Sequence, residues 1–206
     1  MKQREQIRRL TVRTLLIVLV VLQDLIPMFG NIPLGPLSIT TLPVTVAVVA
    51  VVLGPKEGTI IGFVWGLLTW IRAFVYPSSA LAPLIFTNPL ISVVPRMLIG
   101  LFAGYAFKWL VKILPKALSA GIAGLIAAAT NTVLVLGGIY LFVNTPAVAA
   151  GYHVASGHLA QALMVIVTTN GVTEAITTAI LTPLIALPVM VAVKKGSTLL
   201  STDREI

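Results

Sequence analysis

The sequence predicts an all-α, polytopic membrane protein in which six transmembrane helices form a single domain over residues 1–206. Hydrophobic residues make up 58% of the chain and charged residues only 10%. A soluble domain has about 45–50% apolar residues and about 25% charged residues. A water-soluble fold of this length could therefore not bury so many apolar side chains. Apolar runs of about the 20 residues that a helix needs to cross the hydrocarbon core also recur six times, separated by Gly, Pro and charged residues.

The six expected helices are bounded by these breaks in the apolar pattern. They cover residues 10–26, 37–53, 57–76, 92–111, 118–143 and 158–193. The last segment is too long for one perpendicular crossing. We therefore expect it to tilt, to break near Asn170 and Gly171, or to kink at Pro183 and Pro188.

The basic residues predict the orientation of these helices. Those on one side, if the helices alternate, are Lys2, Arg4, Arg8, Arg9, Arg13, Lys56, Lys108, Lys112, Lys116, Lys194, Lys195 and Arg204, whereas the opposite loops, at about residues 27–36, 77–89 and 144–157, contain no Lys or Arg. Because cytoplasmic loops are enriched in basic residues, both termini are expected in the cytoplasm of a cell whose plasma membrane the chain crosses. The net charge of +8 then reflects topology and contact with anionic lipid. It does not indicate nucleic-acid binding, which requires basic residues spread over a water-exposed face.

Five polar side chains inside the expected helices are the candidates for a site at membrane depth. Arg72, Arg96 and Glu174 are ionisable, and each costs about 2.5–3.5 kcal/mol at membrane depth. With Asn131 and Asn170 they are expected to meet in the outer half of the membrane, around a cavity in which a guanidinium suits a carboxylate or phosphate. Two alternatives stay open. Glu174 neutralises one arginine while the other reaches the interface, and the two asparagines form interhelical hydrogen bonds.

The outer loop and three aromatic positions add further candidates. Thr87 and Asn88 precede Pro89 and either hydrogen-bond a ligand as part of a lid or form an Asn-Pro turn. Trp65, Trp70 and Tyr140 either line an apolar pocket or belong to the aromatic belts at the membrane surface.

No catalytic or metal-binding set is expected. The chain has no Cys, and His153 and His158 fall in one outer loop without a third ligand. Glu174 is a lone carboxylate at membrane depth, without the paired carboxylates or the nucleophile and base that an intramembrane enzyme needs. The chain is therefore expected to be no enzyme and to hold no metal or cofactor.

Glycines recur at four-residue spacing in two expected helices. Gly58, Gly62 and Gly66 share one face of the third helix, and Gly100 and Gly104 repeat the pattern in the fourth. Such faces let helices approach closely in lipid. Either an internal seam or a partner subunit would use them.

Three segments carry a family resemblance. They are IPLGPLSITTLPVTVAVVAVVLGPKEGTIIGFVWGL (residues 32–67), VPRMLIGLFAGY (94–105) and TNTVLVLGGIYLF (130–142). They resemble the substrate-binding S-components of energy-coupling factor (ECF) vitamin transporters, and within that family the pantothenate-type group most. The resemblance implies a six-helix subunit that binds a vitamin from outside and docks on a transmembrane coupling subunit and two ATPase subunits. ATP would be hydrolysed by those partners, in agreement with the lack of a Gly-rich phosphate loop in this sequence.

Pantothenate, which the resemblance favours, offers one carboxylate, an amide and hydroxyls. We expect Arg96, with Arg72 as second choice, to pair with the carboxylate. The expected partners of the amide and hydroxyls are Asn131, Asn170 and Thr87.

The resemblance also implies a docking surface on the first three helices, often with an Ala-xxx-Ala pattern in the first. The first helix here contains TLLIVLVVLQDL and lacks that pair. Docking is therefore expected at Ala47, Ala50, Gly58, Gly62 and Gly66.

Other ligands and other classes remain as alternatives. Folate, riboflavin or a thiamin-precursor pyrimidine would want stacking residues, and the outer halves supply only Phe74, Phe86 and Tyr140, which favours a flexible aliphatic substrate. A stand-alone secondary transporter or channel would be expected to show inverted repeats, and no convincing repeat is visible.

Overall fold

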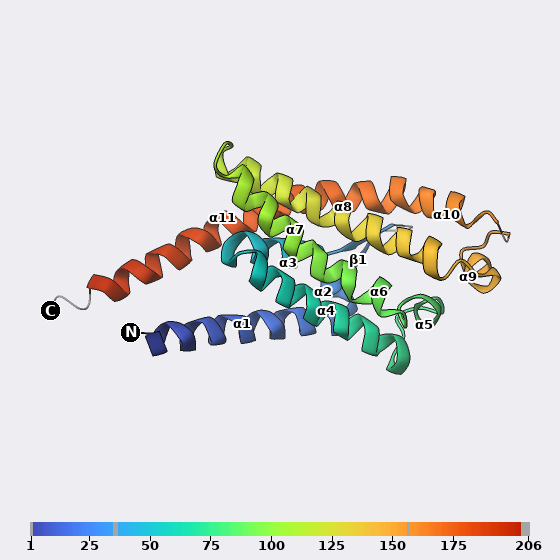
Figure 1. Ribbon diagram of the computed structural model, residues 1–206, viewed down its shortest axis with the longest axis horizontal. Helices are drawn as coiled ribbons and strands as arrows, with labels where there is room; N and C mark the ends of the chain where they lie inside the picture. Colours follow the sequence, from blue (N-terminus) through green and yellow to red (C-terminus); the bar gives the residue numbers. More distant parts are fainter. Residues whose placement is uncertain (1, 35–36, 156, 203–206) are drawn as a thin grey trace.

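The computed structural model describes residues 2–34, 37–155 and 157–202. In chain order its elements are α1 Lys2–Leu25, α2 Pro27–Gly30, β1 Asn31–Leu34, β2 Leu37–Thr40, α3 Leu42–Leu53, α4 Pro55–Val75, α5 Ala82–Ile85, α6 Pro89–Ser92, α7 Val94–Leu110, α8 Lys116–Phe142, α9 Pro146–Gly151, α10 Leu159–Ile166, the π-helical segment η1 Val167–Gly171 and α11 Val172–Thr202. The long helices run side by side along the long axis of the molecule (Figure 1). Helix α1 begins and α11 ends at one end of this bundle, and the short helices α5 and α9 lie at the other.

Four helical segments among the described residues are long and apolar enough to cross a membrane. They are Pro55–Val75, Pro89–Leu110, Lys116–Phe142 and Leu159–Val193, and they correspond to the third to sixth expected helices. Large apolar side chains lie exposed along their outer surfaces, as lipid contact requires. The fold is therefore an α-helical bundle of the polytopic membrane class.

The second expected helix is wrong in its first part. Residues Leu37–Thr40 form strand β2, which pairs with β1 as an antiparallel hairpin in the register Asn31↔Thr40. The β-branched residues before Pro43 favour an extended backbone, and the helix begins only at Leu42. Its 12 residues rise about 18 Å, well short of a core of roughly 30 Å.

Helix α3 occupies the middle of the bundle. Most of its side chains are buried, and it packs on α4, α7, α8 and α11. A helix that is apolar on every side is stable where other helices surround it. Its composition therefore fits an inner position better than a lipid-facing one.

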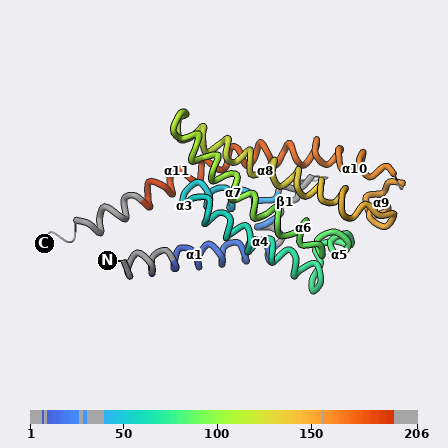
Figure 2. The backbone as a smooth tube through the Cα atoms, viewed as in Figure 1, coloured from blue at the N-terminus to red at the C-terminus, as the bar shows by residue number. Residues whose placement is uncertain are grey.

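The last expected helix is interrupted where the sequence indicated. Helix α10 ends at Ile166, η1 carries Asn170 and Gly171, and α11 follows. The predicted break is thereby confirmed as a π-helical turn, a feature frequent at functional sites. Helix α11 continues through Pro183 and Pro188. Figure 2 shows α10 running beside α8.

The small residues expected at a docking surface form an internal seam instead. A methyl group added at Gly62 would lie 2.0 Å from the carbonyl oxygen of Arg96, and one at Gly58 would lie 2.5 Å from Cβ of Ala50. A methyl group added at Gly66 would likewise meet the backbone of Ser92 and Val93, at the junction of α6 and α7.

The two alanines are equally enclosed, since Ala47 is 0% and Ala50 1% exposed. The partner-docking prediction for Ala47, Ala50, Gly58, Gly62 and Gly66 is therefore wrong. Their close packing is already satisfied by α3, α4 and α7, so that none of their surface remains for a second chain.

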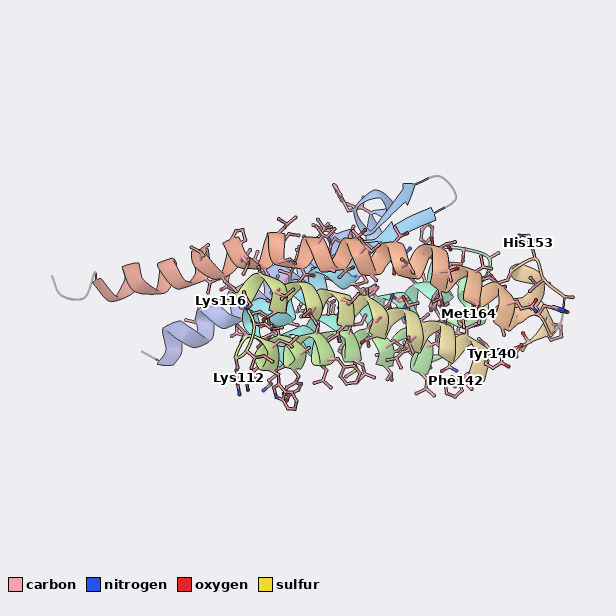
Figure 3. The ribbon with its side chains drawn as sticks, turned by 90° about the horizontal axis from the view of Figure 1, so that it is seen from above. Lys112, Lys116, Tyr140, Phe142, His153 and Met164 are labelled. Atoms are coloured by element: carbon pink, nitrogen blue, oxygen red, sulfur yellow. The ribbon has the colours of Figure 1, made fainter. Side chains whose placement is uncertain are left out.

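Charge separates the two ends of the bundle. Lys112 and Lys116 lie near the end where α1 begins, and His153 lies at the opposite end (Figure 3). Arg204 is outside the described residues, as are the side chains of Lys2, Arg4, Arg8, Arg9, Lys194 and Lys195.

A further ion pair joins the first two long helices. Arg13 on α1 donates from Nε to Oε2 of Glu57 at 2.9 Å and from Nη2 to Oε1 at 2.6 Å. Glu57 is in the first turn of α4, where a negative charge is also favoured by the helix dipole.

Candidate functional site: a buried polar cluster

Arg96 is the most enclosed cation among the described residues. It is the third residue of α7, and only 5% of it is exposed. Its guanidinium carbon lies 5.2 Å from the ring centroid of Trp65 on α4 and 5.2 Å from that of Phe86, next to α5. Nη1 donates to the carbonyl oxygen of Ile91. Two aromatic faces and a carbonyl thus hold the guanidinium in one orientation.

This position lies between two apolar cores. Trp65 belongs to the larger core, centred on α3. Phe86 packs against a second core that includes Ile85, Ile139 and Val148 and joins α5, α8 and α9. Arg96 therefore brings a charge to the junction of the two cores, where water is excluded.

Part of the hydrogen-bonding capacity of Arg96 is unused. Its Nε is buried and has no hydrogen-bond partner among the described residues. The ion pairs found in that part of the chain, Arg13–Glu57 and Arg72–Asp24, do not include it. A buried donor in this state favours an additional acceptor.

Arg72, the second choice for the carboxylate, is already paired. Its Nη1 lies 2.9 Å from Oδ2 of Asp24 on α1 and also donates to the carbonyl oxygen of Asp24. Asp24 is 8% exposed. One alternative from the sequence had Glu174 neutralise an arginine, whereas in the structure Asp24 pairs with Arg72. Asp24 was missed as a site residue, although an acid at the end of an apolar run is itself a signal.

Glu174 holds the end of the β-hairpin. It lies in the first turn of α11, is 8% exposed, and accepts a hydrogen bond on Oε1 from the backbone N–H of Thr40 at 3.2 Å. Its charge and that of Asp24 both act on Arg96. Glu174 thus connects the segment before α3 with α11 and faces the same interior as Arg96.

Asn131 and Asn170 supply unpaired acceptors from two neighbouring elements. Oδ1 of each is buried and has no hydrogen-bond partner among the described residues. Asn131 is on α8 and Asn170 on η1. The residues that follow them, Thr132 and Gly171, are in contact, since a methyl group added at Gly171 would lie 3.0 Å from the side chain of Thr132. The alternative in which these side-chain oxygens accept a hydrogen bond from another helix is therefore not realised in the described part of the chain.

Three other candidates lie elsewhere. Oδ1 of Asn88 accepts from the N–H of Leu90 at 3.0 Å, and the hydroxyl of Thr87 donates to the carbonyl of Pro83 at 2.8 Å. Both side chains serve the turn before α6, as the Asn-Pro alternative expected. Tyr140 is 47% exposed and points outward near the end of α8 (Figure 3).

We group the remaining polar residues under the name polar cluster: Asp24, Arg72, Arg96, Asn131, Asn170 and Glu174. Asp24, Arg96 and Glu174 are buried, and the other three are partly buried. Arg72 pairs with Asp24, and the charges of Asp24 and Glu174 act on Arg96. Arg72 is in the last turn of α4 and Glu174 in the first turn of α11, which places the charged members at helix ends away from the chain termini. The fold and this cluster define the class as a polytopic α-helical membrane protein with a buried, polar interior site.

Comparison with known proteins narrows the class. The chain belongs to the family of ECF transporter substrate-specific components, whose family model matches residues 8–186.

Two relatives in this family carry specific names. A pantothenate transporter, PanT, of Leuconostoc mesenteroides subsp. mesenteroides is 40% identical over 131 residues, which cover 60% of this chain and 64% of that protein. A pantothenic acid transporter, PanT, of Lactococcus lactis subsp. cremoris is 31% identical over 192 residues, which cover 87% of this chain and 91% of that protein. The match to the first thus spans slightly under two thirds of that relative. Both relatives are transporters rather than enzymes.

Proposed function

We propose that this chain is the substrate-binding subunit of an ECF-type importer and that its substrate is pantothenate. The observation that carries the proposal is Arg96, a buried guanidinium clamped by Trp65 and Phe86 with Nε unpartnered in the described residues. Such a group suits the single carboxylate of a small organic acid. The names of the two relatives support this choice of acid.

The rest of the ligand would meet the two asparagines. Pantothenate carries two hydroxyls and an amide N–H beside its carboxylate, and all three are hydrogen-bond donors. The unpaired, buried Oδ1 atoms of Asn131 and Asn170 are acceptors of the matching kind. Donor groups on a ligand would therefore satisfy two oxygens that have no partner within residues 2–34, 37–155 and 157–202.

The topology belongs to the same proposal. The chain forms one domain of six spans, with both termini in the cytoplasm and the polar cluster toward the outer face of the plasma membrane. It receives its driving force from a coupling subunit and two ATPases. Because the seam of α3, α4 and α7 is closed, the coupling subunit docks on a surface other than that seam.

Retention of a vitamin by the purified protein tests the proposal. We expect calorimetry and native mass spectrometry to show binding of pantothenate, and none of comparable strength for folate, riboflavin or the thiamin-precursor pyrimidine. Replacing Arg96 by Ala is expected to weaken binding by about 2–5 kcal/mol, as for loss of a buried charge partner. Unchanged affinity in Arg96→Ala would show that Arg96 does not bind the ligand. Retention of another vitamin would show that pantothenate is not the substrate. Co-purification of two ATPase subunits tests the importer class separately.

A further inference from the structure

The ionisable members of the polar cluster balance one another before any ligand binds. Asp24 and Glu174 are acids, and Arg72 and Arg96 are bases, so the ionised cluster has no net charge. Asp24, Arg96 and Glu174 are each less than a tenth exposed, and the side chain of Arg72 is 21% exposed. A balanced set is the arrangement that a low-dielectric interior tolerates best.

The elements packed around Glu174 contribute no further charge at this level. The hairpin of β1 and β2 and helix α3 contain no ionisable residue, and η1 contains none. On α8 the ionisable residues are Lys116, at its first position, and Tyr140, which is exposed near its end. The charge that acts on Glu174 is therefore that of Arg96, and the charge of Asp24 acts on Arg96 in turn.

A carboxylate ligand upsets this balance. On the proposed function, one monoanion enters beside Arg96, and the cluster then carries three negative and two positive charges. An uncompensated charge at this depth is strongly unfavourable. Binding of the anion is favoured if a positive charge enters with it, and a proton is the smallest such charge.

Glu174 is the member best placed to receive a proton. The carboxylate of Asp24 is already in an ion pair, 2.9 Å from Nη1 of Arg72. Glu174 is in neither of the ion pairs of the described residues, and the charge of Arg96, which acts on it, is the one that a ligand carboxylate would take over.

The protonated form of Glu174 would also find hydrogen-bond partners. Its carbonyl oxygen keeps the bond from the N–H of Thr40. The new hydroxyl needs an acceptor. Oδ1 of Asn170, four residues earlier in the chain, has no partner among the described residues, and its two lone pairs can accept from both this hydroxyl and a ligand donor. Protonation thus keeps the bond from Thr40.

We propose that each monocarboxylate bound by this protein is accompanied by uptake of one proton from water, which converts the Glu174 carboxylate to the carboxylic acid. The proposal rests on the proposed function for the site of the ligand carboxylate. No other bond is made or broken, and the net charge of the cluster stays at zero. Affinity for the anion then falls as pH rises, by up to tenfold per pH unit wherever the uptake is complete. A neutral ligand of the same shape binds without a proton.

Calorimetry in several buffers measures this uptake directly. Pantothenate is titrated into the purified protein at one pH in buffers of different ionisation enthalpy, and the slope of the observed heat against that enthalpy gives the number of protons. We expect close to one proton for pantothenate and close to zero for its alcohol analogue, in which CH2OH replaces the carboxylate. This comparison needs no variant of the protein. Binding of pantothenate with no proton taken up would overturn the inference and leave the proposed function standing.

Two matched variants locate the proton. Glu174→Gln is expected to bind pantothenate with no proton uptake and without the pH dependence. Glu57→Gln, which changes a carboxylate paired with Arg13 at the other end of α4, is expected to keep the wild-type uptake. Infrared difference spectra should show a protonated carboxyl band on binding in the wild type and not in Glu174→Gln. Undiminished uptake in Glu174→Gln would contradict the assignment to Glu174. A wild-type protein that retains no pantothenate at all would refute the proposed function itself.

Discussion

Arg96 combines two properties that lipid-embedded cations rarely share. Its guanidinium is almost fully enclosed, yet it lies against two ring faces and a carbonyl rather than against a carboxylate within 4.0 Å. Ring faces attract a cation without neutralising it, so that the positive potential stays available to a ligand. A lysine would lose the planar contact with both rings and the fork geometry.

The contact with Trp65 gives a prediction at this scale. We expect Trp65→Leu to weaken pantothenate binding by about 1–2 kcal/mol, because it removes one face of a desolvated cation–π contact. Trp65→Phe, which keeps a ring, is expected to lose less. Calorimetry on the purified variants measures both, and Trp109→Leu on the outer side of α7, where Trp109 is 75% exposed, is the control. Equal affinity in Trp65→Leu and the wild type would show that the ring does not position Arg96.

The ion pair of Asp24 and Arg72 gives a second prediction at the residue scale. Arg72→Met alone leaves a buried carboxylate without its partner and is expected to lower the free energy of unfolding by about 3–5 kcal/mol. Asp24→Leu combined with Arg72→Met is expected to recover most of this loss, since neither charge then remains. Thermal unfolding in detergent compares the variants. Losses that simply add in the double variant would show that the two side chains do not stabilise each other.

Among the elements, α4 and α7 depend most on close approach. Gly58 and Gly100 face each other so tightly that a methyl group at Gly100 would lie 2.1 Å from the backbone of Gly58. Van der Waals contact between backbones is a main source of helix association in lipid. The seam also fixes Arg96, whose carbonyl oxygen lies opposite Gly62.

A pair of glycine substitutions tests this seam. Gly62→Ala is expected to reduce stability by about 1–3 kcal/mol through overpacking and to weaken pantothenate binding by displacing Arg96. Gly137→Ala on α8 is the control, because a methyl group there would meet no heavy atom within 4 Å. It is expected to be neutral or to gain up to about 1 kcal/mol from helix propensity. Unfolding midpoints in detergent measure both, and equal midpoints would argue against a closed seam.

The segment α10–η1–α11 runs from the end of the bundle that carries α9 to the polar cluster (Figure 1). The π-helical turn inserts one extra residue per turn locally, and Asn170 lies within it. The sequence indicated a break here because Asn and Gly interrupt an apolar run. It gave no sign that the break would be helical rather than a loop.

At the scale of the whole molecule, the two ends of the bundle differ in charge and in structure. Lys112 and Lys116 lie toward one end, and the other end is covered by α5 and α9 (Figures 1 and 3). This asymmetry underlies the proposed orientation.

Labelling of single cysteines tests that orientation, because the chain has no Cys of its own. In intact cells Ser78→Cys, between α4 and α5, is expected to react with a membrane-impermeant maleimide. Ile113→Cys, which lies in the turn between α7 and α8 and is 77% exposed in the isolated chain, is expected to react only after the cells are permeabilised. The reverse pattern would invert the proposed topology, and labelling of both in intact cells would contradict an odd number of crossings between them.

The apolar runs predicted both ends of the third, fourth and fifth helices to within two residues. They predicted the start of the sixth to within one residue, whereas α11 continues to Thr202. They failed at residues 37–41, where hydropathy does not distinguish a strand from a helix. The glycine pattern predicted close packing but not its partner. Trp65, Arg96 and Glu174 lie buried and Asn131 and Asn170 half-buried, and their role in binding stays a prediction. The side chains of Thr87 and Asn88 bond within their own turn, and Tyr140 is exposed.

The free energy of transferring a side chain into the hydrocarbon core depends mainly on that side chain. The sequence alone was therefore enough to predict which segments enter the membrane and which polar residues need partners there. Pairing depends on how far each helix is rotated and on which helix lies beside it, and these follow from packing along the whole length of the bundle. Only the tertiary structure therefore decided that Asp24 pairs with Arg72, that the small residues face inward, and that Arg96 keeps a donor free.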